Sequence, residues 1–471
     1  MFELHHLTAQ EQWDWLRRGD ITPTELAEHY LARIDRLNDE LGAFTTVTRD
    51  AALSRAADLE SHGPTAAPLW GLPLGDKDLS RRAGVRTTFG SRLFEQFVPE
   101  ESDEIVLALD AAGGVSLGKT SAPEFGLPSY TESLVGPPAR TPWNTALGAG
   151  GSSGGAAVAV AAGLLPVAPG SDGGGSVRIP AAACGLVGLK PSRGLVPSGT
   201  GLTSLAGLVT PGPLARTVAD AAMLLDALVE AAPYPYTVRA PRWSEGPLLG
   251  AAVRGEGRFQ LGVMTTSPWD DAYDIEIAPE ATAALDLAIA ELSALGHGIE
   301  QFGLEPDPSY APNFRTIWQA GAAGIPAEGS DLEKLEPLTR WLVARGRELS
   351  ARQLSEALLA LTLFERSVIR QFAGFDAVLT PALAMTPRPV GWYDSEDAER
   401  NFAQQVQYTP FTSFANVSGL PAITLPVAQT ADGLPMGVQL IGRPGGEHVL
   451  LAIGAQLERR IGWQKRHPPQ W

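Results

Sequence analysis

Short apolar runs bounded by glycine or proline alternate along this chain with longer segments whose apolar residues follow helical spacing. Residues 103–113 (DEIVLALDAAG) have the helical pattern, and residues 114–120 (GVSLGKT) follow with the pattern of a short buried strand. The alternation returns later, where strand-like runs at 259–264 and 375–383 enclose helical segments. Interleaved strands and helices predict an α/β fold, a single domain with a large mixed, twisted β-sheet covered by helices on both faces.

The predicted single domain, residues 1–471, divides into four parts. They are an N-terminal helical segment (1–60), a core segment (65–225), a surface excursion rich in proline, glycine and charge (232–258), and a C-terminal part of the same sheet (259–471). Thr22-Pro23 is expected to end one N-terminal helix and start the next. Residues 212–231 predict one strongly periodic helix, and Asp432-Gly433 predicts the turn of a hairpin between two late strands.

Charge and cysteine content narrow the class of protein. The chain has 36 Lys and Arg against 53 Asp and Glu, a formal charge of −17, which argues against nucleic acid or an anionic membrane as partner. Its single cysteine, Cys184, excludes an internal disulfide and a cysteine-based metal cluster within one chain. The first 20 residues have no secretory pattern, and the apolar run 156–169 is too short to span a bilayer. We therefore expect a cytoplasmic protein.

Two motifs match enzyme signatures whose structural context is missing. Residues 113–120 (GGVSLGKT) fit the P-loop pattern, but the expected order is helix, strand and then a proline-rich segment, with no helix to receive a phosphate. We interpret them as a buried strand. Residues 150–155 (GGSSGG) contain G-x-S-x-G twice, yet no strand precedes them as a nucleophile elbow requires.

Two glycine-serine runs and one lysine form the pattern that carries chemistry. Ser152 follows Gly150-Gly151, and Ser176 follows three glycines 24 residues later; Lys77 lies upstream in GLPLGDKDLS. Separately, the lysine is typical of a surface charge and the runs are typical of turns. Together they resemble the amidase signature family. The resemblance rests on GGSSGG at 150–155, GGGSVRIPAAACGLVGLKPSRG at 173–194, GKTSAPEFG at 118–126, PWN at 142–144, GPLARTVADAA at 212–222 and GLPMGVQLIG at 433–442.

The resemblance implies a Ser–cis-Ser–Lys triad. Ser176 would be the nucleophile, Ser152 the relay after a cis peptide bond to Gly151, and Lys77 the base, since serine needs a base within hydrogen-bond reach. The backbone N–H groups of the loop that ends at Ser176 would form the oxyanion hole; they belong to Gly173, Gly174, Gly175 and Ser176. The residues expected to support this loop are Ser153, Asp172 and Arg178.

Lys77 can act as a base only when it is neutral. At the ordinary lysine pKa of about 10.4, only on the order of one molecule in a thousand is neutral at pH 7, so the role requires burial away from acids. Asp76 and Asp78 flank the lysine. If residues 76–78 are extended, both carboxylates point to the opposite face from Lys77.

The implied reaction is hydrolysis of a linear amide through an acyl-enzyme, without metal or cofactor. Esters and carbamates pass through similar oxyanions, and arylamides and carbamates are the leading small-molecule substrates. We expect segments 126–135 and 305–345 to line the pocket, with Gly126, Tyr130 and Trp318 as contacts, in a monomer or homodimer. Two alternatives stay open: the glutaminase component of an amidotransferase, which needs a partner protein to supply ammonia to aminoacyl-tRNA, and a non-catalytic binding protein on the same fold.

Overall fold

The computed structural model describes residues 3–196, 204–230 and 246–471. An eight-stranded sheet with the order β4-β6-β5-β10-β11-β9-β7-β8 forms its centre. Strand β7 pairs in parallel with β8 and β9, and the other neighbours are antiparallel, so the sheet is mixed as predicted. The strands are β4 (Val167–Asp172), β5 (Val187–Lys190), β6 (Thr210–Ala215), β7 (Gln260–Val263), β8 (Gly298–Gln301), β9 (Ala377–Pro381), β10 (Ala422–Gln429) and β11 (Pro435–Gly442).

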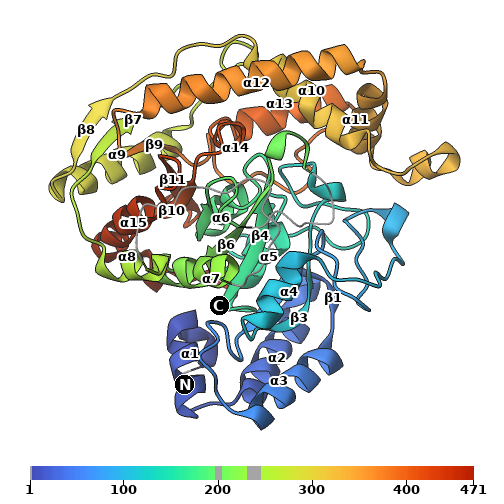
Figure 1. Cartoon of the computed structure of the whole chain (residues 1–471), viewed down its shortest axis with the longest axis vertical. Helices are drawn as coiled ribbons and strands as arrows, with labels where there is room; N and C mark the ends of the chain where they lie inside the picture. The colour runs from blue at the N-terminus through green and yellow to red at the C-terminus, as the bar shows by residue number, and fades with distance from the viewer. Residues whose placement is uncertain (1–2, 197–203, 231–245) are drawn as a thin grey trace.

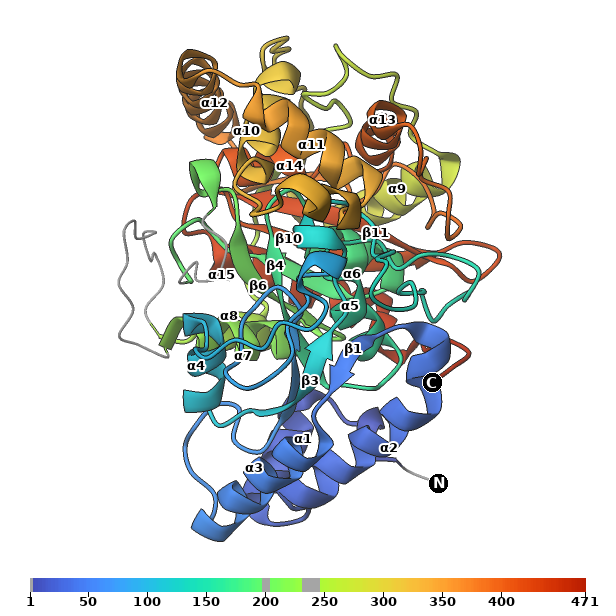
Figure 2. The same ribbon diagram turned by 90° about the vertical axis from the view of Figure 1, so that its right-hand side faces the viewer.

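Helices pack against both faces of this sheet, which confirms the predicted fold class (Figures 1 and 2). In Figure 1 the N-terminal helices α1–α3 lie at the bottom and α10–α13 at the top, with the strands between them. The α-helices are α1 (Ala9–Arg18), α2 (Pro23–Leu41), α3 (Arg49–His62), α4 (Glu104–Ala111), α5 (Gly154–Ala161), α6 (Arg178–Cys184), α7 (Val218–Glu230), α8 (Leu248–Arg254), α9 (Pro279–Ala294), α10 (Tyr310–Ala322), α11 (Pro337–Arg347), α12 (Ala351–Phe372), α13 (Ala398–Tyr408), α14 (Ser413–Val417) and α15 (Glu447–Ile461). Short 3-10 helices are η1 (Leu4–His6), η2 (Arg92–Phe94), η3 (Glu124–Gly126), η4 (Leu205–Gly207), η5 (Gly329–Lys334) and η6 (Trp463–Lys465).

A second sheet, which the sequence did not distinguish from the first, has the order β1-β3-β2. Its strands are β1 (Phe44–Val47), β2 (Pro73–Lys77) and β3 (Val115–Thr120). Strand β3 comes from the P-loop-like motif and is almost entirely buried, which confirms its interpretation as a strand. The lysine of that motif, Lys119, is buried and donates a hydrogen bond to the carbonyl of Ser80, so it is unavailable to a phosphate.

The N-terminal helices begin where the sequence predicts. The Thr8 and Thr22 side chains each accept a hydrogen bond from the backbone three residues on, and a glutamate there returns the bond, so both starts are capping boxes. Pro23 occupies the first turn of α2, where its missing N–H costs no hydrogen bond. The expected break at Thr22-Pro23 is confirmed.

Two predicted boundaries are wrong. Residues 212–231 do not form one helix, because 210–215 are strand β6 and α7 begins only at Val218. The predicted surface excursion, 232–258, includes α8, which packs against α7 and α15 and buries Leu248 and Ala252. Residues 231–245 of that excursion lie outside the described residues.

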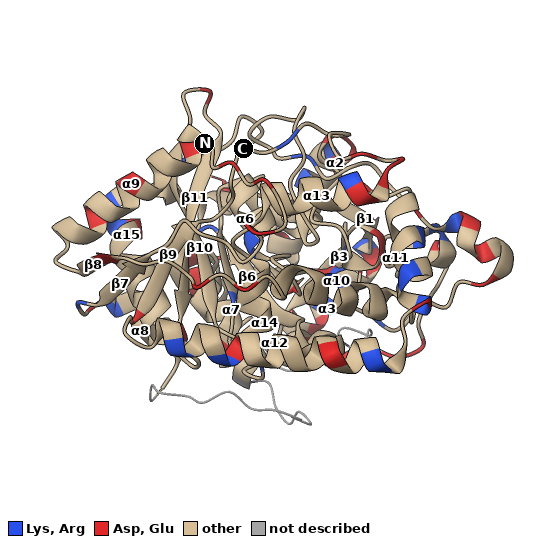
Figure 3. Cartoon of the chain, turned by 90° about the horizontal axis from the view of Figure 1, so that it is seen from above, with Lys and Arg blue, Asp and Glu red and all other residues tan. Residues whose placement is uncertain are grey.

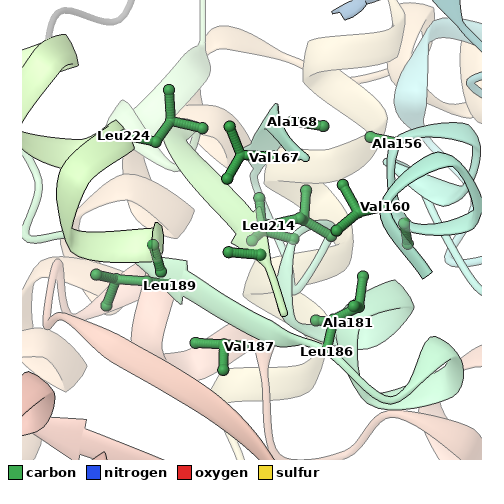
Figure 4. Packing of buried hydrophobic residues seen from close by; sticks show 14 of the residues in the cluster. Ala156, Val160, Val167, Ala168, Ala181, Leu186, Val187, Leu189, Leu214 and Leu224 are labelled. Carbon is green, nitrogen blue, oxygen red and sulfur yellow. The ribbon is translucent and has the colours of Figure 1, made fainter. Parts of the chain in front are cut away.

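Small residues allow close packing behind the glycine-serine runs. All eight residues of α5 are buried, and a Cβ on Gly155 would overlap the backbone of Ser121 and Ala43. Figure 4 shows Val160 of α5 near Leu214 of β6, with Leu189 of β5 and Leu224 of α7 in the same cluster. This dense core fixes the strands whose ends carry the site.

The outer helices carry the charge. In the view of Figure 3, acidic and basic side chains lie side by side on α9, α11 and α12. Within the described ranges, no helix combines the length and the apolar character needed to cross a membrane.

Candidate active site

Lys77 is the last residue of β2 and its side chain is buried. Its Nζ donates hydrogen bonds to Ser152 Oγ at 2.8 Å, to Ser171 Oγ at 3.0 Å and to the Ser171 carbonyl at 3.2 Å. Burial lowers the pKa of Lys77 from 10.5 to about 7, against the opposing charge of Asp172. A lysine in this state is a base that is substantially neutral near pH 7.

The acids on either side of Lys77 are engaged elsewhere. Asp76 accepts hydrogen bonds from Arg82 Nε at 2.6 Å and Ser116 Oγ at 2.7 Å. Asp78 accepts one from the Thr88 backbone at 3.2 Å. Neither carboxylate bonds to Lys77, as the alternation of side chains along an extended backbone predicts.

The GGSSGG run forms the turn before α5 and includes a cis peptide bond between Gly151 and Ser152, as expected. A Cβ on Gly151 would lie 2.7 Å from the backbone of Tyr130, so only glycine fits. The Ser153 N–H donates to the Ser176 carbonyl at 3.0 Å, and Ser153 Oγ donates to the Ser171 carbonyl at 3.3 Å. Ser153 therefore ties the two serine loops together.

Asp172 organises the loop before the second serine. Its carboxylate accepts hydrogen bonds from the N–H of Gly175 at 2.8 Å and of Val177 at 3.1 Å, and it pairs with Arg178 at 2.9 Å. Both side chains are fully buried, and the Arg178 charge holds the pKa of Asp172 well below its usual range. The two residues support the loop as predicted.

Arg178 has further partners that the sequence reasoning missed. Its guanidinium donates to Gln439 Oε1 and Asn416 Oδ1, both at 2.6 Å, and to the Thr412 carbonyl at 2.9 Å. Thr412 Oγ1 in turn donates to the Gly174 carbonyl at 2.7 Å. A buried arginine implies several acceptors, but no local signal identifies residues more than 230 positions away.

The four predicted oxyanion donors are not equivalent, and Gly175 requires a correction. Its N–H is already bonded to Asp172, so it points into the loop and away from a substrate. Among the described residues, no acceptor is found for the N–H groups of Gly173, Gly174 and Ser176. These three remain the donors that could reach an oxyanion.

Two cavities meet at Ser176. The large cavity, of about 760 Å³, is lined by Leu79, Phe125, Gly126, Leu127, Ser152, Ser171, Gly173, Ser176, Ser204, Leu205, Leu208, Val209, Ile317, Trp318 and Gly321. The aromatic cavity, of about 480 Å³, is lined by Leu127, Pro128, Ser129, Gly174, Ser176, Ile179, Trp269, Phe314, Trp318, Phe402, Gln405, Val406, Thr409 and Ser413. Gly126 and Trp318 thus lie where the sequence places them.

Tyr130 lines neither cavity, contrary to its predicted contact with substrate. Its ring stacks on Tyr393 with centroids 4.0 Å apart, and its hydroxyl accepts a hydrogen bond from Asn401 at 2.9 Å. The backbone of Tyr130 lies against Gly151 instead. It supports the turn that carries Ser152 from behind.

The sequence of residues 25–451 matches the Amidase family. The chain belongs to this family. It is 37% identical over 466 residues to the putative amidase AmiB2 of Mycobacterium tuberculosis, covering 98% of this chain and 97% of that one. It is 34% identical to the first subunit of the glutamyl-tRNA(Gln) amidotransferase of a Roseiflexus species, over 99% and 98% of the two chains. The solved structure of 6-aminohexanoate cyclic dimer hydrolase with its substrate superimposes with a TM-score of 0.90 at 31% identity, covering 99% and 100%.

These similarities make the chain an amidohydrolase, an enzyme that hydrolyses C–N bonds, and the non-catalytic alternative is not supported. In this amidase Ser152 and Ser176 both line the large cavity. Between these two described side chains no direct hydrogen bond is present. A small rotation of either hydroxyl, or the arrival of substrate, would be needed to join them.

One group of side chains in the described ranges could hold a metal ion, and it lies outside both cavities. It consists of Glu3, His5 and His29, whose ligand atoms are within 4.8 Å of one another. Arg33 already lies 3.7 Å from Glu3 and supplies positive charge there.

Proposed function

We propose that this amidase hydrolyses linear amides through an acyl-enzyme on Ser176, with Lys77 as the base and Ser152 as the relay. One observation carries the proposal. A buried lysine whose pKa is lowered to about 7 bonds to Ser152 Oγ at 2.8 Å, beside the cavity that Ser152 shares with Ser176. A lysine that needs no acidic partner and loses its proton near neutral pH is suited to general base catalysis.

The proton follows the order of the three side chains. Ser176 Oγ attacks the amide carbonyl as its proton passes to Ser152 Oγ and the Ser152 proton passes to Lys77 Nζ. When the tetrahedral intermediate collapses, the path reverses and the proton reaches the leaving nitrogen, so that a neutral amine departs. Water then attacks the ester of Ser176, and the same relay accepts its proton and returns one to Ser176.

The N–H groups of Gly173, Gly174 and Ser176 supply the charge stabilisation in this proposal. Each donor aimed at the oxyanion contributes about 3 kcal/mol to the transition state. Asp172 and Thr412 hold the loop by its other polar groups, the Gly175 N–H and the Gly174 carbonyl. The donors are therefore held in place before a substrate arrives.

Esters and carbamates form the same kind of tetrahedral oxyanion, so we propose them as further substrates. Arylamides and aryl carbamates suit the apolar cavities and serve as practical probes. A second candidate, the glutaminase component of an amidotransferase, draws on the 34% identity to the glutamyl-tRNA(Gln) amidotransferase protein. The two candidates differ in the charge of the substrate.

The test uses neutral p-nitroanilide, p-nitrophenyl ester and aryl carbamate substrates with the wild type, Ser176→Ala, Ser152→Ala and the exposed control Ser61→Ala. We expect Ser176→Ala to lose at least about 10⁴-fold in kcat, as nucleophile removal does in other serine hydrolases. Mass spectrometry of the wild type after rapid acid quench should show one acyl group on the peptide containing Ser176. Undiminished turnover in Ser176→Ala would refute the nucleophile.

A further inference from the structure

We infer that the substrates of this amidase are uncharged and apolar on both sides of the scissile bond, with the acyl group in the aromatic cavity and the leaving amine in the large cavity. This inference rests on the proposed function, because it assigns the two sides of the bond by the path of the proton. It goes further in naming a substrate class and in giving each cavity one half of the substrate.

The position of Ser152 decides which half lies where. Ser152 lines the large cavity and does not line the aromatic one, while Ser176 lines both. The proton that Ser152 returns must reach the leaving nitrogen, so that nitrogen lies on the Ser152 side of the carbonyl carbon. The acyl substituent is attached on the other side of the same carbon. It therefore enters the aromatic cavity.

The walls of both cavities are uncharged. Among the described residues that line them, there is no Asp, Glu, Lys, Arg or His; the polar side chains are all neutral hydroxyls and one amide. Lys77 lies behind Ser152 and Ser171, and Arg178 is paired with Asp172, so neither charge is free for a substrate. A charged group next to the scissile bond would lose its hydration without gaining a partner.

Glutamine is the informative negative case. It carries an ammonium and a carboxylate a few bonds from its side-chain amide, and both would have to enter the aromatic cavity with the acyl part. Neither finds an opposite charge among the described residues that line it. The charge of the lining therefore favours a free-standing amidase over the glutaminase component of a larger complex.

The walls of the two cavities differ in shape. Trp269, Phe314, Trp318 and Phe402 form the aromatic cavity, and Trp269 is fixed by a 3.0 Å hydrogen bond from its Nε1 to Ser413 Oγ. The Trp269 and Phe314 rings meet edge to face with centroids 5.2 Å apart. Rigid ring walls of this kind suit a flat or branched acyl group. The large cavity has mainly aliphatic walls and suits an aromatic or alkyl amine.

Matched variants separate the two assignments. Phe402 lines only the aromatic cavity and Leu205 only the large one. Each is changed to alanine and tested on two substrate series: p-nitroanilides with acetyl, butyryl, benzoyl and succinyl groups, and benzoyl amides of p-nitroaniline, benzylamine and butylamine. The rate of deacylation is measured separately from the burst with a benzoyl ester.

We expect Phe402→Ala to lower kcat/KM for benzoyl relative to acetyl at least tenfold and to change the deacylation rate. Leu205→Ala should change the ranking of the amines at least fivefold and leave deacylation within twofold, because the amine has departed by then. Since Phe402 is buried, Phe402→Leu repeats the test if the alanine variant does not fold. The reverse pattern, or equal effects of both variants on both series, would overturn the assignment.

The charge arm uses the wild type alone. Succinyl-p-nitroanilide and glutamine should show kcat/KM at least about a hundredfold below that of the butyryl anilide. Comparable rates for glutamine would overturn the inference while leaving the proposed function intact. If no neutral amide is hydrolysed in a Ser176-dependent way, the proposed function itself fails, and the inference fails with it.

Discussion

Replacing Lys77 with methionine should abolish activity and at the same time stabilise the fold at pH 6. Methionine keeps an unbranched apolar stem in the buried site and removes the ammonium group. In the wild type, burial lowers the pKa of Lys77 to about 7, so at pH 6 the folded protein holds a buried, mostly protonated amine. The substitution removes that unfavourable charge together with the base.

The magnitude follows from the change in pKa. A fall from 10.5 to about 7 corresponds to about 5 kcal/mol of unfavourable free energy in the charged folded state. Between pH 7 and 10.5 the unfolded chain binds more protons at this site than the folded one, so stability rises with pH in that window, and the penalty is complete below pH 7. Loss of the hydrogen bonds to Ser152 and Ser171 returns about 1–3 kcal/mol. Lys77→Met should therefore gain about 2–4 kcal/mol at pH 6.

Activity should report the same pKa. With a base of pKa about 7, the neutral fraction is about 0.1 at pH 6 and about 0.9 at pH 8, so kcat/KM rises about tenfold and then levels off. An ordinary lysine would give a rise of about a hundredfold over that range with no plateau.

Urea unfolding at pH 6, 8 and 10 measures the stability of the wild type and Lys77→Met, with the exposed Lys334→Met as the control. The pH profile of kcat/KM on a neutral p-nitroanilide measures the activity. The reasoning is refuted if Lys77→Met is no more stable than the wild type at pH 6. It is refuted equally if the acid limb of the wild-type profile is centred above pH 9.

Two further predictions concern the scaffold of the site. Asp172→Asn should destabilise the fold by about 3–5 kcal/mol in urea unfolding at pH 7, because Arg178 is left buried without its carboxylate; the low folded pKa of Asp172 means that this difference shrinks as acid protonates the wild-type carboxyl. Gly155→Ala should lower Tm sharply or prevent folding, because the new Cβ overlaps the backbone of Ser121, whereas Gly136→Ala meets nothing within 4 Å and should leave Tm within about 2 °C. Equal Tm values for the two alanine variants would contradict the packing argument.

Local chemistry made several elements predictable from the sequence. The two capping boxes and Pro23 define the N-terminal helices through contacts within three or four residues. Strand β3 follows from a short apolar run, and the hairpin β10–β11 follows from its turn. The glycine-serine runs and Lys77 indicated the family, since their spacing is written in the sequence itself.

Strand β6 shows where local preference fails. Its residues, TPGPLA, have two prolines and a glycine, a composition depleted in strands, and the helical pattern that follows extends across them. They become a strand because β4 and β5 lie on either side and provide backbone partners. That environment exists only after distant segments have come together.

Residue types, their spacing and the short-range signals that start helices and turns were determined by the sequence alone. Tertiary structure alone decided that Gln439 and Asn416 meet Arg178, that Tyr130 lies behind the GGSSGG turn, and that two cavities with uncharged walls meet at Ser176. It also lowered the pKa of Lys77. The physical reason is that burial and long-range contacts are properties of the whole packed chain, because desolvation depends on every element that excludes water from a site.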